Sequence, residues 1–257
     1  MPHQYERRRF LSRLLLGAGA AMLTGCDKLS HSEWFSSVLS SSERLTKSTH
    51  HLLRTRKLMA QEFDEADLSP SFRSNGTDFP YSKEYQALAK NNFLDWQLVV
   101  DGLVENPLKL TLAQIQQLPS RTQITRHDCV EGWSAIGKWK GTPLHELLGL
   151  AKPSPQAKYV VFHCADPMND DGTHLYYESI DMDDAHHAQT ILAYQLNDET
   201  LPIDNGAPIR LRVERQLGYK HAKYIMRIEL VESFEHIEGG KGGYWEDSAG
   251  YEWYAGI

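Results

Sequence analysis

Short apolar strands alternate with short helices along most of the sequence, and this alternation most restricts the folds that the chain can adopt. The predicted strands are rich in Val, Ile, Leu and Tyr, and they cover residues 96–101, 158–164, 191–196, 208–214 and 224–232. The predicted helices are residues 112–118, with Thr111 as N-cap, and residues 144–150, with Thr142 as N-cap. Because long amphipathic helices between the strands are missing, a doubly wound sheet is disfavoured and a mixed α+β fold is predicted.

The charge balance and the cysteines narrow the classes of function. The 257 residues include 27 Lys and Arg against 34 Asp and Glu, a formal net charge of −7. Because phosphate backbones bind surfaces with surplus cations, this balance argues against nucleic acid as the main partner. A content of 41% hydrophobic and 24% charged residues is that of a globular protein and excludes a polytopic membrane protein. The sequence has three cysteines, Cys26, Cys129 and Cys164. Three is an odd number and too few for a disulfide framework.

The N-terminal segment has the pattern of an export signal. Arg7-Arg8-x-Phe10-Leu11 precedes an apolar run from Leu14 to Leu23, which is about half as long as a transmembrane helix. The basic part resembles a twin-arginine signal. Leu23-Thr24-Gly25-Cys26 resembles a lipobox, at which a bacterial signal peptidase cleaves and Cys26 is lipidated. Twin-arginine export carries proteins that are already folded, and many of them hold a redox cofactor.

These motifs divide the sequence into three parts. Residues 1–25 are predicted to be a signal peptide, residues 26–68 a Ser-rich tether with a helix, and residues 69–257 the folded domain. Asp27, directly after the lipidated cysteine, resembles a retention signal for the inner membrane. The expected location is therefore the periplasm, with the lipid on Cys26 anchoring the chain to the inner membrane.

Polar and reactive side chains surround Cys129. A cysteine that only packs in a core seldom has charged neighbours, which here are Arg126, His127, Asp128 and Glu131. Nearby cations lower the pKa of a thiol and make the thiolate a nucleophile or a soft metal ligand. In an extended segment the side chains of His127 and Cys129 would share one face, so both roles stay open. The sequence has no Cys-x-x-Cys pair and no His-Glu-x-x-His helix to favour a zinc site.

A second polar cluster follows between residues 205 and 223. Asn205-Gly206-Ala207-Pro208-Ile209-Arg210 is followed by Gly218-Tyr219-Lys220-His221-Ala222-Lys223. A turn, a strand and another turn with basic residues at both ends could cradle an anionic group through backbone N–H groups and cationic side chains. A hairpin with a solvated basic tip would have a similar sequence, so this cluster alone does not identify a site.

Taken together, these segments resemble the molybdopterin-binding domain of the sulfite-oxidase superfamily, and in particular its periplasmic methionine-sulfoxide reductase branch. The matching segments follow the family's order over roughly residues 90–235, and they are Cys129-Val-Glu-Gly-Trp-Ser134, Trp139-Lys-Gly-Thr-Pro-Leu144, Ala157-Lys-Tyr-Val-Val-Phe162, Asn205-Gly-Ala-Pro-Ile-Arg210, Gly218-Tyr-Lys220 and Lys223. The resemblance implies a mixed-sheet domain with one molybdenum-molybdopterin (Mo-MPT) and without the C-terminal immunoglobulin-like domain of sulfite oxidases. It implies that Cys129 is the catalytic cysteine and the molybdenum ligand. The positions that it assigns to cofactor binding are Asn91, Cys129, Cys164, Asn205, Arg210, His221, Ala222 and Lys223.

Two departures from the family pattern bear on the chemistry. Cys164 stands where the reductase branch has a threonine, which would place a second sulfur near the metal. Sulfite oxidases have an arginine-rich stretch after the metal cysteine, whereas this chain has Val130-Glu131-Gly132-Trp133. A carboxylate in the pocket would repel a doubly charged anion. A neutral or organic oxygen-transfer substrate is therefore favoured over sulfite.

The expected function is that of an exported molybdenum oxidoreductase that moves an oxygen atom to or from a small substrate in a two-electron change. Arg210 and Lys223 would neutralise the cofactor phosphate. Electrons would pass to or from a haem protein, either a membrane cytochrome b or a soluble cytochrome c. Two alternatives stay open: a cofactor-free periplasmic lipoprotein that binds or scaffolds a partner, and a hydrolase with Cys129 as nucleophile and His127 as base.

Overall fold

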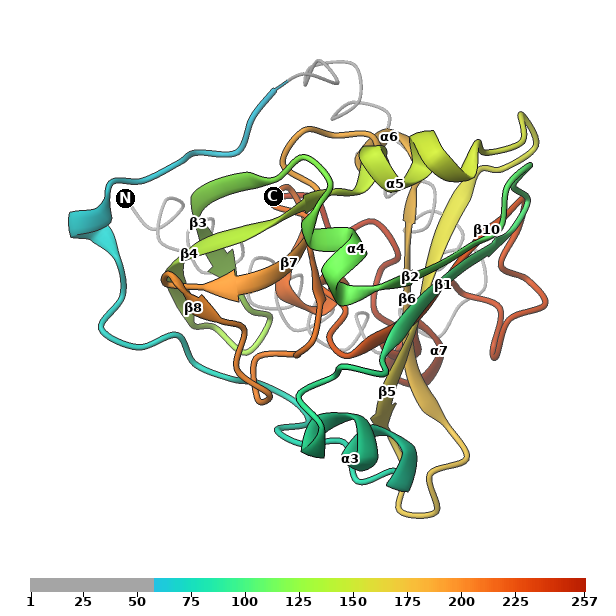
Figure 1. Cartoon of the computed structure of the whole chain (residues 1–257), viewed down its shortest axis with the longest axis horizontal. Coiled ribbons are helices and arrows are strands. Elements are labelled where there is room, and N and C mark those ends of the chain that lie inside the picture. The colour runs from blue at the N-terminus through green and yellow to red at the C-terminus, as the bar shows by residue number, and fades with distance from the viewer. Residues whose placement is uncertain (1–57) are drawn as a thin grey trace, which may run out of the picture. The chain divides into compact units, whose positions relative to one another are not determined.

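The computed structural model describes residues 58–257, which form two β-sheets with short helices around them (Figure 1). Residues 1–57 are not described, so the expected signal peptide, the lipidation at Cys26 and most of the tether lie outside the described residues. The helices are η1 (Glu65–Asp67), α3 (Lys83–Lys90), α4 (Leu112–Gln116), α5 (Leu144–Ala151), α6 (Met182–Ala185), η2 (Gly218–Lys220) and α7 (Tyr244–Ala249). The strands are β1 (Gln97–Gly102), β2 (Leu108–Thr111), β3 (Arg121–Asp128), β4 (Ser134–Pro143), β5 (Tyr159–Pro167), β6 (Leu175–Asp181), β7 (Ile191–Leu196), β8 (Glu199–Thr200), β9 (Arg210–Arg212) and β10 (Ile225–Val231).

One sheet has mixed strand directions, and the other is antiparallel. The first has the order β2-β1-β10-β5-β6, in which β1 and β10 are parallel and the other neighbours are antiparallel. The second has the order β3-β4-β7-β8, and β9 pairs with β7. Figure 1 shows the second sheet on the left and the first sheet on the right. This combination of a mixed sheet and short helices confirms the predicted α+β fold.

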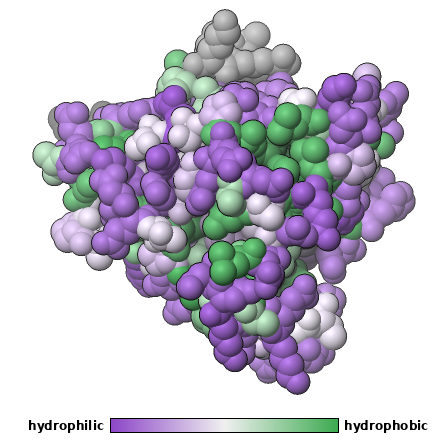
Figure 2. Space-filling view, viewed as in Figure 1, coloured by the Kyte–Doolittle hydropathy of each residue, from purple (hydrophilic) through white to green (hydrophobic). Residues whose placement is uncertain are grey.

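The main apolar core lies where the two sheets and α5 meet. Leu98 and Phe162 of the first sheet pack in one cluster with Leu192 and Leu211 of the second sheet and with Leu148 of α5. All five are completely buried, and each side chain of this size stabilises the fold by about 1.5–3 kcal/mol through its burial. On the face shown in Figure 2, hydrophilic residues cover most of the surface, and apolar residues gather in an area to the right of the centre.

The predicted helix starts are partly correct. Helix α4 begins after Thr111, whose hydroxyl accepts a hydrogen bond from the Gln114 N–H at 3.2 Å, as predicted. Thr142 does not cap α5, because its hydroxyl donates to the Ile115 carbonyl at 2.9 Å and Pro143 takes the N-cap position. Thr142 therefore joins β4 to α4 and has no capping role.

The sequence pattern did not predict the long hairpin of β3 and β4. The side chains of β3 that point inward are Gln123, Thr125 and His127, and all three are buried. A half-buried strand is normally recognised by apolar residues on its buried face, and here that face is polar. The turn of this hairpin carries Cys129, so the element that sequence reasoning missed is the one that positions this residue.

The described end of the predicted tether lies along β3. The Phe63 N–H donates to the Ile124 carbonyl at 2.9 Å, and Glu62 forms an isolated bridge with Thr125. Within residues 58–68 the structure has one helical element, the three-residue η1. Residues before 69, the predicted start of the folded domain, therefore already form backbone contacts with β3.

Candidate active site at Cys129

Cys129 lies in the turn between β3 and β4. The Cys129 N–H donates to the Trp133 carbonyl at 2.9 Å, and the Gly132 N–H donates to the Cys129 carbonyl at 3.0 Å. Gly132 has a φ of 85°, a backbone conformation that favours glycine. The turn holds Cys129 at the wall of a cavity, where the residue is 8% exposed.

A cavity of about 170 Å³ adjoins Cys129. Parts of the chain that are far apart in sequence build its wall, including the loop before α3, the end of β5, the segment from β9 to η2, and α7. The residues of its wall include Asn75, Cys129, Val130, Glu131, Asp166, Arg210, Tyr219, His221, Lys223, Trp245 and Tyr251.

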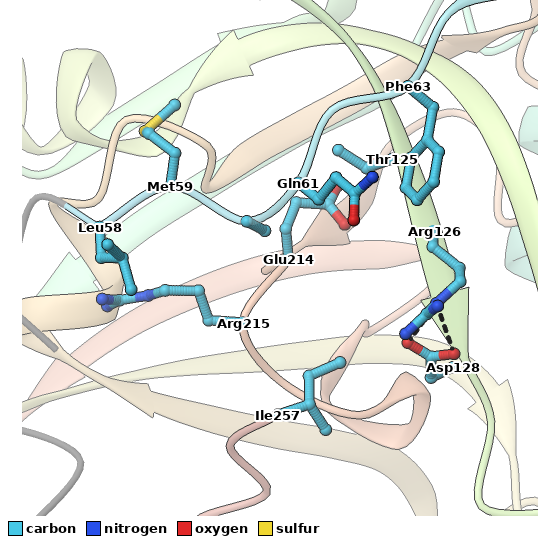
Figure 3. A pocket seen from close by; sticks show the side chains of 11 residues that line it. Leu58, Met59, Gln61, Phe63, Thr125, Arg126, Asp128, Glu214, Arg215 and Ile257 are labelled. Carbon is cyan, nitrogen blue, oxygen red and sulfur yellow. Dashed lines mark hydrogen bonds and ion pairs between the residues drawn. The ribbon is translucent and has the colours of Figure 1, made fainter.

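A larger cavity of about 250 Å³ lies between β3 and the segment 58–63 (Figure 3). Apolar side chains such as Phe63 share its wall with the ion pair of Arg126 and Asp128, which Figure 3 shows at one side. Among the described residues, no wall residue of this larger cavity has a buried side-chain polar atom without a partner. The smaller cavity does have such atoms, so it is the better candidate for a ligand site.

Four buried polar atoms at or beside the smaller cavity have no hydrogen-bond partner among the described residues. They are Asp166 Oδ1, Asn205 Nδ2, Arg210 Nε and His221 Nδ1. His221 Nε2 lies 3.1 Å from the Gln216 carbonyl oxygen, which only accepts, so the ring proton is assigned to Nε2 and Nδ1 accepts. The site therefore presents two free donors and two free acceptors, which suits a polar heterocyclic ligand.

The structure brings most of the predicted site residues together. Those that line the cavity are Cys129, Arg210, His221 and Lys223. Asn205 lies behind them, and its carbonyl accepts from Arg210 Nη1 at 3.0 Å. Ala222 is completely buried, and its carbonyl accepts from the Leu211 N–H at 2.8 Å.

The structure does not bring Asn91 and Cys164 to the cavity wall. Asn91 is the C-cap of α3, and its amide donates to the Asp95 carboxylate at 2.6 Å, a local contact within the loop after the helix. Cys164 is 2% exposed in the main apolar core, and its thiol lies 3.9 Å from the Phe162 carbonyl. Burial raises the pKa of the Cys164 thiol well above its ordinary value. Its surroundings are those of a packing residue.

Sequence reasoning missed two polar residues that do line the cavity. Asn75 reaches it from the start of the domain, and its amide donates to Cys129 Sγ at 3.9 Å. This residue lies in a turn-rich segment without periodicity, so its place could not be predicted. Asp166 is 5% exposed at the end of β5. A carboxylate directly after a run of buried apolar residues was the signal that could have identified it.

Lys223 holds the loop that carries Asn75. Its ammonium donates at 2.7, 2.7 and 2.9 Å to the main-chain carbonyls of Asn75, Thr77 and Asp204. Burial lowers the pKa of Lys223 to about 8, and the nearby Arg210 acts in the same direction. Because three carbonyls use the three N–H groups, Lys223 fixes this loop at the cavity wall. The contact of Lys223 with a cofactor phosphate stays a prediction.

A buried charged network lies under Cys129. Arg212 and Glu214 form an ion pair whose side chains are completely buried, and Arg212 Nη1 donates to His127 Nδ1 at 2.9 Å. Burial lowers the pKa of His127 well below its ordinary value, with the charge of Arg212 as the next cause. His127 Nε2 has no hydrogen-bond partner among the described residues, and a Cβ on Gly218 would lie 2.5 Å from it.

These protonation states bear on the hydrolase alternative. Burial is the largest effect on the Cys129 thiol and raises its pKa, while a hydrogen bond from the Glu131 backbone N–H lowers it in part and the Glu131 carboxylate raises it again. An activated nucleophile needs a lowered thiol pKa and a base within hydrogen-bond reach. The lowered pKa makes His127 a weak base, and the described residues show no hydrogen bond between His127 and Cys129, whose thiol instead accepts from Asn75, so the geometry does not support a Cys129–His127 nucleophile pair.

Two further observations concern metals and membranes. Within residues 58–257, no group of three or more His, Cys, Asp and Glu side chains is arranged to hold a metal ion. In the same range, every helix is too short or too polar to cross a bilayer.

Comparison with known proteins places the chain in a family. The model of the family described as "oxidoreductase molybdopterin binding domain" matches residues 85–236. A protein of Azospira oryzae that carries the name of a protein-methionine-sulfoxide reductase subunit is 37% identical over 97% of this chain and 87% of its own length. The protein-methionine-sulfoxide reductase catalytic subunit of Campylobacter jejuni is 32% identical over 88% of this chain and 73% of its own length.

A solved structure shows the same fold. The sulfane dehydrogenase of Paracoccus pantotrophus superimposes with a TM-score of 0.52 and 23% identity. The match covers 61% of this chain and 41% of that one.

We predict a pH-dependent stability difference for Asp166→Asn. Burial raises the pKa of Asp166 from 3.8 to about 7, so the folded protein binds more protons than the unfolded chain between these values. The wild type therefore loses stability as the pH rises through this window, and the loss is complete above about pH 7. The free energy of unfolding of the variant, relative to that of the wild type, should therefore rise by up to about 1.4 kcal/mol per pH unit within the window. Above about pH 7 the difference between the two proteins should stay constant. Urea unfolding at a series of pH values measures this difference, and parallel profiles for the two proteins would contradict it.

Proposed function

Because this chain belongs to the family of the oxidoreductase molybdopterin binding domain and is a molybdopterin-dependent oxidoreductase, we propose that it reduces a sulfoxide by two-electron oxygen-atom transfer. The observation that carries the proposal is the cavity in which Cys129, free polar atoms and aromatic side chains meet. The names of the two relatives, which refer to methionine sulfoxide, support this substrate class. The substrate would be a methionine sulfoxide side chain.

The residues at the cavity fit a molybdopterin. A pterin ring carries N–H donors and nitrogen and oxygen acceptors along its edges. The free acceptors Asp166 Oδ1 and His221 Nδ1 and the free donors Arg210 Nε and Asn205 Nδ2 complement such edges. A buried polar atom without a partner lowers stability, so these atoms favour a polar ligand over an empty cavity. The Cys129 thiolate, a soft ligand, would hold the metal.

In this proposal the bound cofactor supplies the two-electron chemistry. Reduction of a sulfoxide consumes two electrons and two protons and yields a thioether and water. The residues of the chain would position the cofactor and supply a proton. Asp166, whose pKa burial raises to about 7, is suited to hold a proton at the cavity near neutral pH.

The charge at the rim of the cavity supports a neutral substrate. The Glu131 carboxylate accepts a hydrogen bond from Trp133 Nε1 at 2.9 Å, which fixes it beside Cys129. The guanidinium of Arg73 lies over the Trp133 ring, 5.4 Å from its centroid, and helps to hold the ring in place. A sulfite dianion would be repelled by Glu131, whereas a sulfoxide carries no net charge.

The electrons would come from a haem protein in or near the membrane, either a membrane cytochrome b or a soluble cytochrome c. The relatives' names support a second protein, because each is named as a subunit. The sequence supports a periplasmic location for this electron transfer. The Arg7-Arg8 motif favours twin-arginine export to the periplasm, and Cys26 favours a lipid anchor on the inner membrane.

The first prediction from this proposal concerns Cys129. Purified wild type that matured in a molybdopterin-producing host should contain stoichiometric molybdenum and pterin and should reduce a methionine sulfoxide peptide with a reduced dye. Cys129→Ser should lower the activity by more than about 100-fold and release metal, because it removes the protein's metal ligand. Cys164→Thr should keep the metal, because the hydroxyl can replace the thiol's contact with Phe162 in the core.

Two outcomes would contradict the proposal. One is full metal retention and unchanged activity in Cys129→Ser. The other is a wild type that contains no molybdenum and shows no redox activity but captures a partner, which would favour the cofactor-free binding module.

A second prediction concerns Glu131. Glu131→Gln removes the negative charge at the rim, so kcat/KM for sulfite oxidation with ferricyanide should rise by about 5-fold or more over the wild type. The kcat/KM for a neutral sulfoxide should change much less. Glu84→Gln, which removes a charge on the exposed side of α3, serves as the control. An equal change for sulfite and sulfoxide would show that Glu131 does not act through charge.

A third prediction concerns the proposed export route. Replacement of both Arg7 and Arg8 by Lys should leave the uncleaved protein in the cytoplasm, because the twin-arginine pair would be the recognised signal. Arg13→Lys, a change outside the pair, should leave export intact. Cell fractionation and immunoblotting measure the distribution, and a normal periplasmic amount of the Lys-Lys variant would rule out this route.

A further inference from the structure

The last part of the chain builds one wall of the cavity. Helix α7 ends at Ala249, its C-cap Gly250 has a φ of 69° that reverses the chain, and the Tyr251 N–H donates to the Trp245 carbonyl at 3.2 Å. This turn stacks the two rings with centroids 5.9 Å apart and planes 26° apart. Trp245 and Tyr251 both line the cavity, and they lie beyond residues 85–236, which the family's model matches. We call this pair the aromatic platform.

A buried ion cluster fixes the platform from behind. Lys220 Nζ donates to Glu246 Oε1 at 2.8 Å and also to the carboxylate of Glu178. The three side chains are at most 1% exposed. Because Glu246 lies on α7 and Lys220 on η2, the cluster ties the helix that carries Trp245 to the cavity wall. Removal of one partner from such a buried pair is strongly destabilising, so the platform is held firmly.

The aromatic platform lines the cavity together with other apolar side chains. The Tyr219 ring packs edge-on against Tyr251, with centroids 5.1 Å apart, and its hydroxyl donates to the Glu252 carbonyl at 2.5 Å. The polar end of Tyr219 is thus occupied, whereas Tyr251 as a residue remains 37% exposed. Val130, next to Cys129 in sequence, is 43% exposed and lines the same cavity. The apolar side chains of Val130 and Tyr251 therefore line the same cavity as Cys129.

We propose that the aromatic platform binds the apolar part of the substrate, the methylene and methyl groups of a methionine sulfoxide side chain, and so determines specificity. This inference rests on the proposed function. Methylene groups gain free energy when they leave water, and a sulfur atom makes favourable contacts with aromatic rings. The aromatic platform supplies both, while the Glu131 charge at the same rim disfavours anions.

The experiment measures binding separately from catalysis. A peptide that contains methionine sulfone, which sulfoxide reduction does not consume, is titrated into the molybdenum-loaded protein by calorimetry. Tyr251→Ala and Trp245→Ala should each raise the Kd by about 5- to 30-fold, whereas Tyr251→Phe, which keeps the ring, should stay within about twofold of the wild type. The KM for the methionine sulfoxide peptide should rise with the Kd, and kcat should change less.

Tyr81→Ala is the matched control. Tyr81 is 48% exposed and is not part of the cavity wall, so its loss should leave the Kd unchanged. The melting temperature and the molybdenum and pterin contents are measured for every variant. Both contents should equal those of the wild type.

Several results would overturn the inference. One is an unchanged Kd in both alanine variants. Another is loss of cofactor from folded Tyr251→Ala or Trp245→Ala, which would show that the rings hold the pterin. A wild type that contains molybdenum but reduces no sulfoxide would overturn both the proposed function and this inference. A wild type that reduces sulfoxides, with platform variants of unchanged Kd, would overturn this inference alone.

Discussion

The burial of four cations beside one cavity is the constraint on which the rest of the site depends. Arg210, Arg212, Lys220 and Lys223 are each at most 7% exposed, and a charge removed from water destabilises a fold unless it is paired. Carboxylates neutralise Arg212 and Lys220, while main-chain carbonyls hold Arg210 and Lys223. These partners come from distant parts of the chain. Pairing the charges therefore draws the segment 75–77, β6 and α7 together, and the cavity is the space that they enclose.

The same burial sets the protonation states at the site. It raises the pKa of the Cys129 thiol and of the Asp166 carboxyl, and it lowers the pKa of His127. The protein by itself thus disfavours a free thiolate and a charged imidazole. A bound metal reverses this preference for the thiol, because it binds the deprotonated sulfur and supplies the opposite charge. Such an environment suits a cysteine that works as a ligand better than one that works as a nucleophile.

The residues that sequence reasoning missed share a physical cause. Strand β3 escaped prediction because Gln123, Thr125 and His127 turn polar side chains inward, where they meet the Arg212–Glu214 pair. Hydropathy patterns assume an apolar interior, and this part of the interior is ionic. Asn75 was missed because it lies in a turn-rich segment without periodicity. Only its hydrogen bond to Cys129 Sγ and the contact of its carbonyl with Lys223 place it at the cavity.

The family, the α+β fold class and the molybdopterin cofactor could be read from the amino-acid sequence, because short ordered motifs carry that information within a few residues. It also placed Cys129, Arg210, His221 and Lys223 in one group, which the structure brings to one cavity. The contacts of Lys223 with the loop 75–77, the placement of Cys164 in the core and the aromatic platform became visible only in the folded chain. Those features depend on contacts between distant positions, such as the one from Lys223 to a carbonyl 148 residues earlier, and no local pattern encodes such a distance.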